Sequence, residues 1–388
     1  MAKKSQQDDA LVKADLADLV IDDLNKKFKQ SIPAAAYLHD PNISSHVKNW
    51  IPTGCDALDL AISNRPGGGI PEGKIIEIFG DSGTGKSALA VTILANTQRV
   101  GGLAVLIDTE AAATEQFFEA LGVNAEELLY IQLEALEDVY AAVETIIERA
   151  RKTGKDRPVT IVIDSLMGAS TKMELEATYD RQGYATGKAL INSLAMRKIT
   201  NLIAKERITL IGINQIRANM NAGFGGEQWV TSGGKAWAFH SSVRIRLKNM
   251  GQLDGKSDTG QKLILGRRVR AQIIKNRLGP PMRNADYDFY FQSGIDNYGS
   301  WLNLMKEYDI VDQSGAWYSF VHVDEDTGEE RKIKFQSKDF GRLMVENPEI
   351  RDVLYRQICD SFIMNYKISE PFGIDDITVD DNIVNEDQ

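Results

Sequence analysis

Residues 80–87 read Gly-Asp-Ser-Gly-Thr-Gly-Lys-Ser, which is the spacing of a phosphate-binding loop. The glycines let successive backbone N–H groups turn inward onto a phosphate, and a helix that follows points its positive end at the same anion. Lys86 is expected to reach the β- and γ-phosphates, and the Ser87 hydroxyl is placed to bind Mg²⁺. The sequence therefore predicts a nucleoside-triphosphate site formed by Gly80, Asp81, Ser82, Gly83, Thr84, Gly85, Lys86 and Ser87.

The residues on either side of this loop support the assignment. Residues 74–79 are apolar at the spacing of a strand, and residues 87–99 are typical of a helix. This context matters because a phosphate-binding loop works only between a strand and a helix. The alternative is a glycine-rich turn that matches the motif by chance, and it would not need either neighbour.

Carboxylates follow two further apolar runs. Residues 159–164 end in Asp164, which in proteins with this loop holds Mg²⁺ directly or through water; an Asp that merely starts a turn is the alternative. Residues 103–108 lead into Asp108 and Glu110, and either carboxylate could take a proton from water that attacks the γ-phosphate. The spacing alone leaves both acids open as the general base.

A neutral amide ends another predicted strand. Residues 209–214 deliver Asn214 and Gln215 to the carboxyl edge of the sheet, where ligands of open α/β sheets bind. An amide there can hydrogen-bond the γ-phosphate without adding charge, and so distinguish a triphosphate from a diphosphate. The glycine-rich stretch 217–235 follows at once, and loops of that length in compact domains are usually functional.

The alternation of short apolar strands with helices predicts an α/β fold with a mostly parallel central sheet, covered by helices on both faces. The expected strands are 74–79, 103–108, 129–132, 159–164 and 209–214, followed by 241–247, 268–275 and 286–291. The expected helices are 87–99, 114–121, 136–153 and 187–205.

Four parts are expected along the chain: an N-terminal helical arm and linker (1–48), a nucleotide-binding core (49–293), a small α+β domain (294–367) and an acidic, disordered tail (368–388). The arm has apolar residues at helical spacing from Leu11 to Phe28, and they could pack on the chain's own core or on a neighbouring subunit. In the small domain we expect helices over 298–308 and 348–365 and a strand pair, 316–322 and 331–335, with a turn at 324–328.

The bulk composition narrows the class of protein. With 388 residues, 43% of them hydrophobic and 26% charged, the chain is typical of soluble globular proteins. No apolar run approaches the roughly 18 residues of a membrane helix, and the first residues lack a secretory signal, which predicts a cytoplasmic protein without a membrane partner. The two cysteines, Cys55 and Cys359, exclude a disulfide framework or a zinc cluster. The net charge of −10 is unevenly spread, since residues 244–277 form a basic stripe.

The motifs of this chain, and their order along it, resemble those of the RecA-family recombinases, both bacterial RecA and phage members of the family. The likeness runs from about residue 51 to residue 347 and implies a RecA-type P-loop NTPase core. Besides the phosphate loop, it rests on Pro-Thr-Gly-Cys-Asp-Ala-Leu-Asp (52–59), Ile-Asp-Thr-Glu (107–110), Val-Ile-Asp-Ser (162–165), Asn-Gln-Ile-Arg (214–217), Lys-Asn-Arg (275–277), Gly-Ile-Asp-Asn-Tyr-Gly (294–299) and Gly-Ala-Trp-Tyr-Ser (315–319).

The resemblance implies roles that the pattern alone leaves open. Glu110 matches the glutamate that activates the attacking water, in preference to Asp108, and Gln215 matches the γ-phosphate sensor. Phe117 falls where an aromatic ring stacks on adenine. A further pair matches the cations that reach the γ-phosphate bound by the adjacent subunit, namely Lys275 and Arg277. The positions that match residues lining single-stranded DNA are Ser193, Arg197, Arg217, Phe224, Gly233 and Gly234.

The function implied is that of an ATP-dependent DNA recombinase. Such a protein uses ATP and Mg²⁺, polymerises on single-stranded DNA as a helical filament, and pairs that strand with a homologous duplex in recombination and repair. Single-strand-binding and mediator proteins are candidate partners, and the N-terminal helix resembles the segment that docks on the neighbouring protomer. The alternative functions are a ring helicase or another DNA-stimulated ATPase on the same core, and a small-molecule kinase.

The chain departs from bacterial RecA at several places. Thr114 replaces an acid near adenine, and the segment 173–188 is longer and keeps little of the bacterial sequence. Arg181 and Lys188 of this segment could contact DNA phosphates. In the expected second DNA site Asn249 and Gln272 are neutral, while Lys248 and Arg270 remain basic. These departures favour the phage branch of the family.

Overall fold

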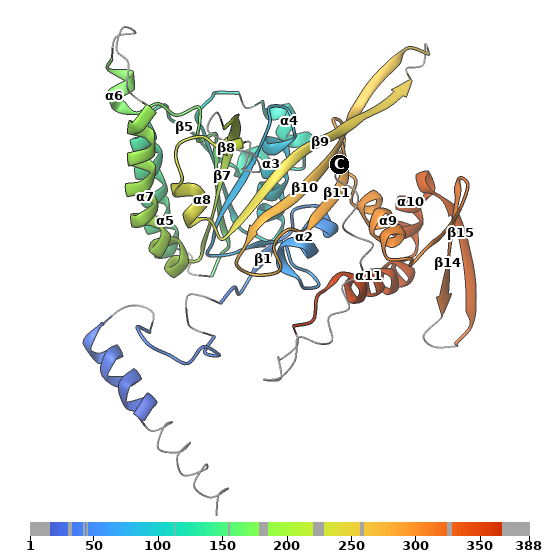
Figure 1. Ribbon diagram of the computed structural model, residues 1–388, viewed down its shortest axis with the longest axis horizontal. Helices are drawn as coiled ribbons and strands as arrows, with labels where there is room; N and C mark the ends of the chain where they lie inside the picture. The colour runs from blue at the N-terminus through green and yellow to red at the C-terminus, as the bar shows by residue number, and fades with distance from the viewer. Residues whose placement is uncertain are drawn as a thin grey trace, which may run out of the picture.

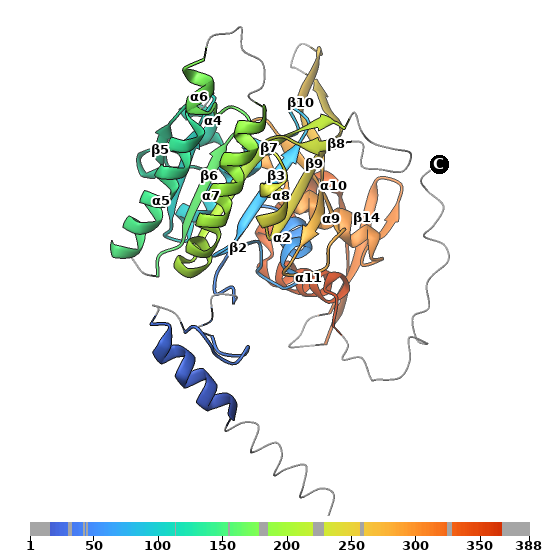
Figure 2. The same cartoon turned by 60° about the vertical axis from the view of Figure 1, so that its left-hand side comes forward.

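The central sheet of the computed structural model has the strand order β12-β11-β10-β9-β3-β7-β6-β4-β5, and β8 pairs with β7. The structure describes residues 16–29, 33–41, 43, 46–112, 114–153, 156–177, 185–219, 229–256, 260–323 and 328–366. Of the predicted features, Phe224, Arg181, most of the turn at 324–328 and the acidic tail lie outside these ranges. Residues 16–27 form the predicted N-terminal helix, which lies apart from the sheet in both ribbon views (Figures 1 and 2).

The middle of this sheet is parallel. Each neighbouring pair from β9 to β5 runs parallel, whereas β10, β11, β12 and β8 pair antiparallel, so the predicted mostly parallel sheet is confirmed. The strands are β3 (Ile75–Gly80), β4 (Leu103–Asp108), β5 (Leu129–Gln132), β6 (Val159–Asp164), β7 (Ile208–Ala218), β8 (Trp229–Thr231), β9 (Val243–Lys256), β10 (Lys262–Asn276), β11 (Asn284–Tyr290) and β12 (Gly294–Ile295). A separate short pair joins β1 (Trp50–Ile51) to β2 (Ile70–Pro71).

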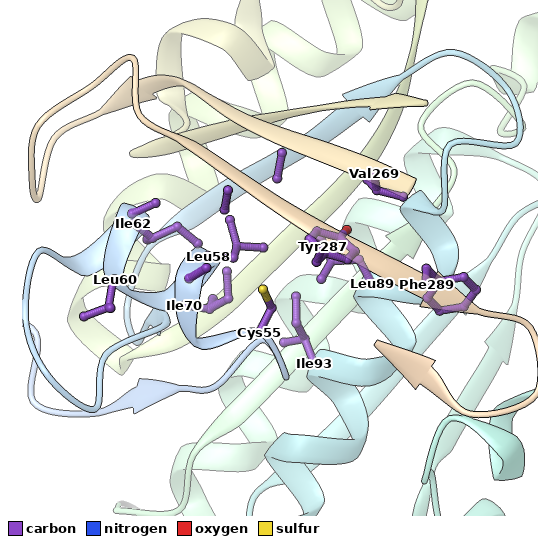
Figure 3. Close-up of a cluster of buried hydrophobic side chains, with 14 of the residues drawn as sticks. Cys55, Leu58, Leu60, Ile62, Ile70, Leu89, Ile93, Val269, Tyr287 and Phe289 are labelled. Atoms are coloured by element: carbon purple, nitrogen blue, oxygen red, sulfur yellow. The ribbon is translucent and has the colours of Figure 1, made fainter. Parts of the chain in front are cut away.

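Alternate residues of the buried strands face opposite sides of the sheet. In β4, Leu106 packs in one apolar cluster and Val105 and Ile107 in another, as the two-residue period of a strand requires. The first cluster, part of which is drawn in Figure 3, includes residues of α2 (Asp56–Ser63), α3 (Lys86–Arg99) and α4 (Glu115–Ala120). The second includes α5 (Leu136–Thr153), α7 (Ala185–Glu206) and α8 (Ala236–His240). These two sets of helices cover the two faces, as predicted.

The C-terminal region adds a small antiparallel sheet, β13-β14-β15, and three helices to one side of the core (Figure 1). The first apolar cluster continues into it, and Trp301 Nε1 donates a hydrogen bond to Asp56 Oδ2 at 2.7 Å. The predicted limits of the domains themselves stay predictions. The elements are α9 (Asn297–Glu307), β13 (Asp312–Ser314), β14 (Trp317–Val323), β15 (Glu330–Gln336), α10 (Ser337–Glu346) and α11 (Pro348–Phe362).

Several elements differ from the prediction. The β9–β10 hairpin is longer than expected and projects beyond the sheet (Figure 1). The stretch 217–235 is not a loop throughout, because β7 runs to Ala218 and β8 pairs with it. Trp229 anchors this pair, since its ring lies 5.1 Å from that of Phe79. Helix α2 was missed because it has only eight residues, too few for the spacing of its apolar residues to distinguish a helix from a strand.

Both cysteines are buried and unpaired. Within the described ranges, none of the helices is both long enough and apolar enough to cross a membrane.

Candidate nucleotide site and DNA-facing residues

The phosphate loop connects β3 to α3. Gly83 and Gly85 have positive φ angles of 70° and 89°, and a Cβ at Gly80 would lie 2.3 Å from the carbonyl oxygen of Leu247. Lys86 Nζ donates to Gly80 O at 3.2 Å and to Asp81 O at 2.6 Å. Burial lowers the pKa of Lys86. Its ammonium is thus partly dehydrated and held by neutral carbonyl oxygens, which an anionic phosphate would outcompete.

Three carboxylates gather beside the start of α3. A cavity of about 90 Å³ is lined by Ser87, Phe117 and the acids Asp108, Glu110 and Asp164. Burial raises the pKa of Asp164 to about 6 despite a hydrogen bond from Ser87, and the negative charges of the other two acids add to the shift.

A cation fits this arrangement, because it would relieve the repulsion among the acids. No three His, Cys, Asp or Glu side chains of the described ranges are grouped so as to hold a metal ion alone. A Mg²⁺ ion at Ser87 and Asp164 would therefore take its remaining oxygen ligands from phosphate and water, as Mg²⁺ usually does in proteins.

The two candidate bases have different surroundings. Asp108 is buried, and its Oδ1 accepts hydrogen bonds from the backbone N–H groups of Glu110 and Ala111 at 2.9 and 2.8 Å, while Tyr130 donates to its Oδ2 at 3.0 Å. Glu110 is exposed beside the cavity, and its Oε1 accepts from the Ser165 hydroxyl at 2.5 Å. Asp108 therefore stabilises the turn that follows β4, and Glu110 is the more exposed carboxylate beside the cavity.

An adjoining cavity of about 320 Å³ lies on the α3 side of the sheet. Loop residues from Gly83 onward form one wall, and Phe117, which is half-buried, lines both cavities. The remaining wall comes from Arg267, Val269, Phe289 and Phe291. Sequence reasoning missed this wall because β10 and β11 are distant from the loop in sequence, and the motif at the end of β10 (275–277) does not include these four residues.

The predicted sensor lies next to the phosphate loop, because Gln215 on β7 pairs in register with Gly80 on β3. Its neighbour Asn214 is buried and donates from Nδ2 to Glu77 Oε1 at 2.9 Å and to Ser232 O at 3.0 Å. Arg244 Nε donates to Glu77 Oε2 at 2.6 Å. This buried network joins β3 to β7, β9 and the end of β8. In the sequence, this network could have been found from Glu77, the single acidic residue of the otherwise apolar strand β3.

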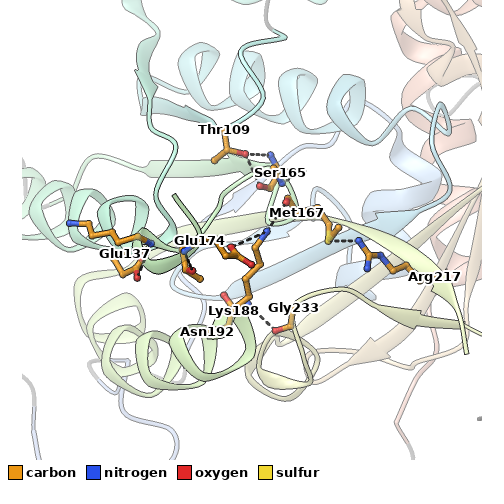
Figure 4. Close-up of polar contacts among 12 residues, drawn as sticks. Thr109, Glu137, Ser165, Met167, Glu174, Lys188, Asn192, Arg217 and Gly233 are labelled. Atoms are coloured by element: carbon orange, nitrogen blue, oxygen red, sulfur yellow. Dashed lines mark hydrogen bonds and ion pairs between the residues drawn. The ribbon is translucent and has the colours of Figure 1, made fainter. Parts of the chain in front are cut away.

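The predicted DNA-facing residues that the structure describes lie on α7 and around β7 and β8. Figure 4 labels two of them, Arg217 and Gly233. Ser193 Oγ donates to Ala189 O at 2.8 Å within α7, and Arg197 Nε donates to Ser193 O at 3.1 Å. Arg217 is exposed at the end of β7. Its Nη2 lies 3.9 Å from the sulfur of Met167.

The two predicted glycines pack directly against α7. Gly233 and Gly234 have positive φ angles of 79° and 87°, and a Cβ at Gly233 would lie 2.7 Å from Asn192 Nδ2. Asn192 Nδ2 also donates to Gly233 O at 2.8 Å (Figure 4). Both glycines therefore allow the chain after β8 to lie close to α7.

Lys275 and Arg277 lie beside α8, on the face of the sheet that α5, α7 and α8 cover. Lys275 Nζ donates to the carbonyl oxygens of Ala238 and Phe239, at 2.9 and 2.8 Å, and Arg277 Nη2 donates to Phe239 O at 3.3 Å. An irregularity in the β9–β10 register between Ile273 and Lys275 turns the lysine toward α8. Burial lowers the pKa of Lys275 to about 8, and the nearby charge of Arg277 adds to the shift. The sheet thus separates these two cations from the chain's own 320 Å³ cavity.

Comparison with known proteins agrees with this architecture. The family model described as the RecA N-terminal domain matches residues 16–296. Protein RecA of Chlamydia trachomatis serovar L2 is 34% identical over 318 residues, which cover 82% of this chain and 84% of the relative. Protein RecA of Chlamydia abortus is 36% identical over 278 residues, or 71% of this chain and 75% of the relative. The chain therefore belongs to the RecA family and is a DNA-dependent ATPase that acts in DNA recombination and repair.

Proposed function

We propose that this chain polymerises on single-stranded DNA with ATP at each interface between protomers, and pairs that strand with a homologous duplex. The observation that carries the proposal is the position of two sets of cations. Lys86 belongs to the phosphate loop, whereas Lys275 and Arg277 lie across the sheet beside α8. If both sets act on one triphosphate, the second set must come from another copy of the chain.

Within one protomer, the loop 80–87 binds the phosphates, and Lys86 moves from the loop carbonyls to the β- and γ-phosphates. Mg²⁺, held by Ser87 and Asp164, would neutralise charge on the phosphates. Glu110 accepts the proton of the attacking water, and Ser165 orients it through its hydrogen bond to Oε1. The ring of Phe117 stacks on adenine between the two cavities.

DNA binding is coupled to the nucleotide through β7. Gln215 contacts the γ-phosphate, and any shift of β7 is transmitted to Arg217 and, through β8, to Gly233 and Gly234. Phe224 belongs to the same stretch. Ser193 and Arg197 of α7 complete the surface proposed to contact single-stranded DNA, whose binding should be sensitive to salt and show little base specificity.

The wider assignments are proposals too. They comprise docking of the N-terminal arm on the adjacent protomer, single-strand-binding and mediator proteins as partners, placement in the phage branch, and action in the cytoplasm, where ATP and DNA occur together.

The family match does not favour the alternative of a ring helicase or other DNA-stimulated ATPase. The proposed role of Lys275 and Arg277 also does not favour a small-molecule kinase, because such an enzyme would need no cations from a neighbouring copy of the chain.

The test combines steady-state ATP hydrolysis, electron microscopy and a strand-exchange assay. We expect hydrolysis to be stimulated by single-stranded DNA, helical filaments with ATP, and pairing with a homologous but not with a heterologous duplex. Closed rings without strand pairing would instead indicate a helicase, and hydrolysis of ATP that depends on a soluble acceptor would indicate a kinase.

A further inference from the structure

A third cation faces the phosphate loop, and it comes from the same chain as the loop. Arg267 on β10 is half-buried, and its Nη1 donates to the carbonyl oxygen of Gly83 at 2.7 Å. It lies opposite Phe289 across the β10–β11 pair, and both side chains line the 320 Å³ cavity beside the loop. The guanidinium therefore reaches the nucleotide cavity from the wall opposite α3.

The neighbouring arginines of β10 have carboxylate partners. Arg268 Nε lies 2.9 Å from Asp288 Oδ1, and Arg270 Nε lies 2.8 Å from Asp286 Oδ1. For Arg267, by contrast, the described part of the chain supplies one hydrogen-bond acceptor, which is the uncharged oxygen of Gly83. A guanidinium has five N–H donors in a planar fork that matches phosphate oxygens. Arg267 thus brings to the edge of the proposed phosphate site a positive charge that has no counter-ion among the described residues.

We propose that Arg267 binds the phosphate chain of the nucleotide held by its own protomer, at oxygens of the α- and β-phosphates that ATP and ADP share. The inference rests on the proposed nucleotide site. Aromatic and aliphatic side chains line the cavity together with Arg267, and an apolar wall strengthens a charge-assisted hydrogen bond relative to water. Phosphate also offers Arg267 two or more anionic acceptors in place of one carbonyl oxygen.

This role differs from those of the other cations. Lys275 and Arg277 are proposed to act on the γ-phosphate across an interface, whereas Arg267 needs no second copy. A contact that ground state and transition state share changes affinity without changing the rate of the chemical step. Arg267 should therefore set how tightly the free protomer holds ATP and ADP.

The test is isothermal titration of ADP and of ATPγS into DNA-free protein, with Mg²⁺ present. The variants are Arg267→Gln, Arg267→Lys and, as a matched control, Arg268→Gln, which removes the next arginine on the opposite face of the same strand. We expect Arg267→Gln to bind both nucleotides about tenfold more weakly, since a hydrogen bond to a charged group contributes about 1.5 kcal/mol or more. Arg267→Lys should lie between Arg267→Gln and wild type, and the control should bind as wild type does.

Unchanged ADP affinity in Arg267→Gln would overturn the inference, as would a loss confined to ATPγS, which would mean a contact with the γ-phosphate. Melting curves of Arg267→Gln distinguish nucleotide binding from a purely structural role of Arg267. A purely structural role predicts a lower melting temperature without nucleotide and the same rise on adding ADP as in the wild type. Lys86→Ala serves as the reference. If wild type fails to bind nucleotide, or Lys86→Ala binds it normally, the proposed nucleotide site is wrong rather than the role of Arg267.

Discussion

Two groups of cations in this molecule, both proposed to act on phosphate, are built in different ways. The Lys86 ammonium rests on carbonyl oxygens of its own loop, five and six residues away in sequence. The Lys275 ammonium rests on the end of α8, 36 and 37 residues away, after an irregularity in the β9–β10 register has turned it there. The first cation thus belongs to a loop of eight consecutive residues, 80–87. The second is assembled by tertiary structure, on the face of the sheet away from the phosphate loop. The contrast suggests that one protomer can bind nucleotide but needs a neighbour to hydrolyse it.

Removing the loop's own cation should have the largest effect. Lys86→Ala is expected to abolish ATP hydrolysis, because Lys86 is the side chain of the loop proposed to contact the β- and γ-phosphates. The fold should survive, since the described residues that accept hydrogen bonds from the Lys86 ammonium are two carbonyls of the loop itself. Hydrolysis assays and a melting curve check both statements. Near-normal turnover in a folded variant would remove the basis for assigning the loop.

The second prediction separates the two acids beside the loop. Glu110→Gln should slow hydrolysis by roughly 10²–10⁴-fold with ATP and DNA binding retained, because an amide cannot accept the proton of water. Asp108→Asn is the matched control. Its remaining oxygen can still accept from the backbone N–H groups of Glu110 and Ala111, so we expect a smaller loss. A greater loss in Asp108→Asn, with binding intact, would show that Asp108 is the base.

A smaller effect should appear in the pH dependence of filament assembly. Since the pKa of Lys275 is lowered to about 8, its amine is charged at neutral pH and loses that charge as the pH rises through about 8. The rate of ATP-dependent assembly on single-stranded DNA should fall over this range, because free protomers then lack one cation for the γ-phosphate. Lys275→Arg keeps its charge and should flatten the profile. The same fall in both proteins would show that another group controls assembly.

Local patterns in the sequence were enough to predict the strand–loop–helix unit around Lys86 and the acids that end β4 and β6. Each of these features lies within a few residues of a strand whose apolar period is clear. Helix α2 was missed because its eight residues are too few for periodicity to assign them to a helix. The β9–β10 hairpin was underestimated because its outer residues pair with each other beyond the apolar part of the sheet.

Other parts of the site depend on contacts between distant segments. The face on which Lys275 lies is set by a register irregularity, which the sequence does not mark. The position of Arg267 at the nucleotide cavity follows from the pairing of β10 with β11 and from its contact with Gly83, 184 residues earlier. In the sequence it was one arginine of a basic stripe. Resemblance to the family supplied the proposed roles of Lys275 and Arg277, which spacing did not indicate.

The central claim, that one active site uses a loop from one protomer and cations from the next, is tested most directly by mixing two inactive variants. Lys86→Ala lacks the loop cation, and Arg277→Ala lacks the cation across the interface, whose removal should cost about 10³–10⁵-fold in rate. In an equal mixture, about a quarter of interfaces should join an intact loop to an intact Arg277, because catalysis needs both halves of the site. DNA-stimulated hydrolysis should then recover to at most about that fraction of the wild-type rate. If the mixture stays inactive although both variants assemble together on DNA, Arg277 acts within its own protomer and the claim is wrong.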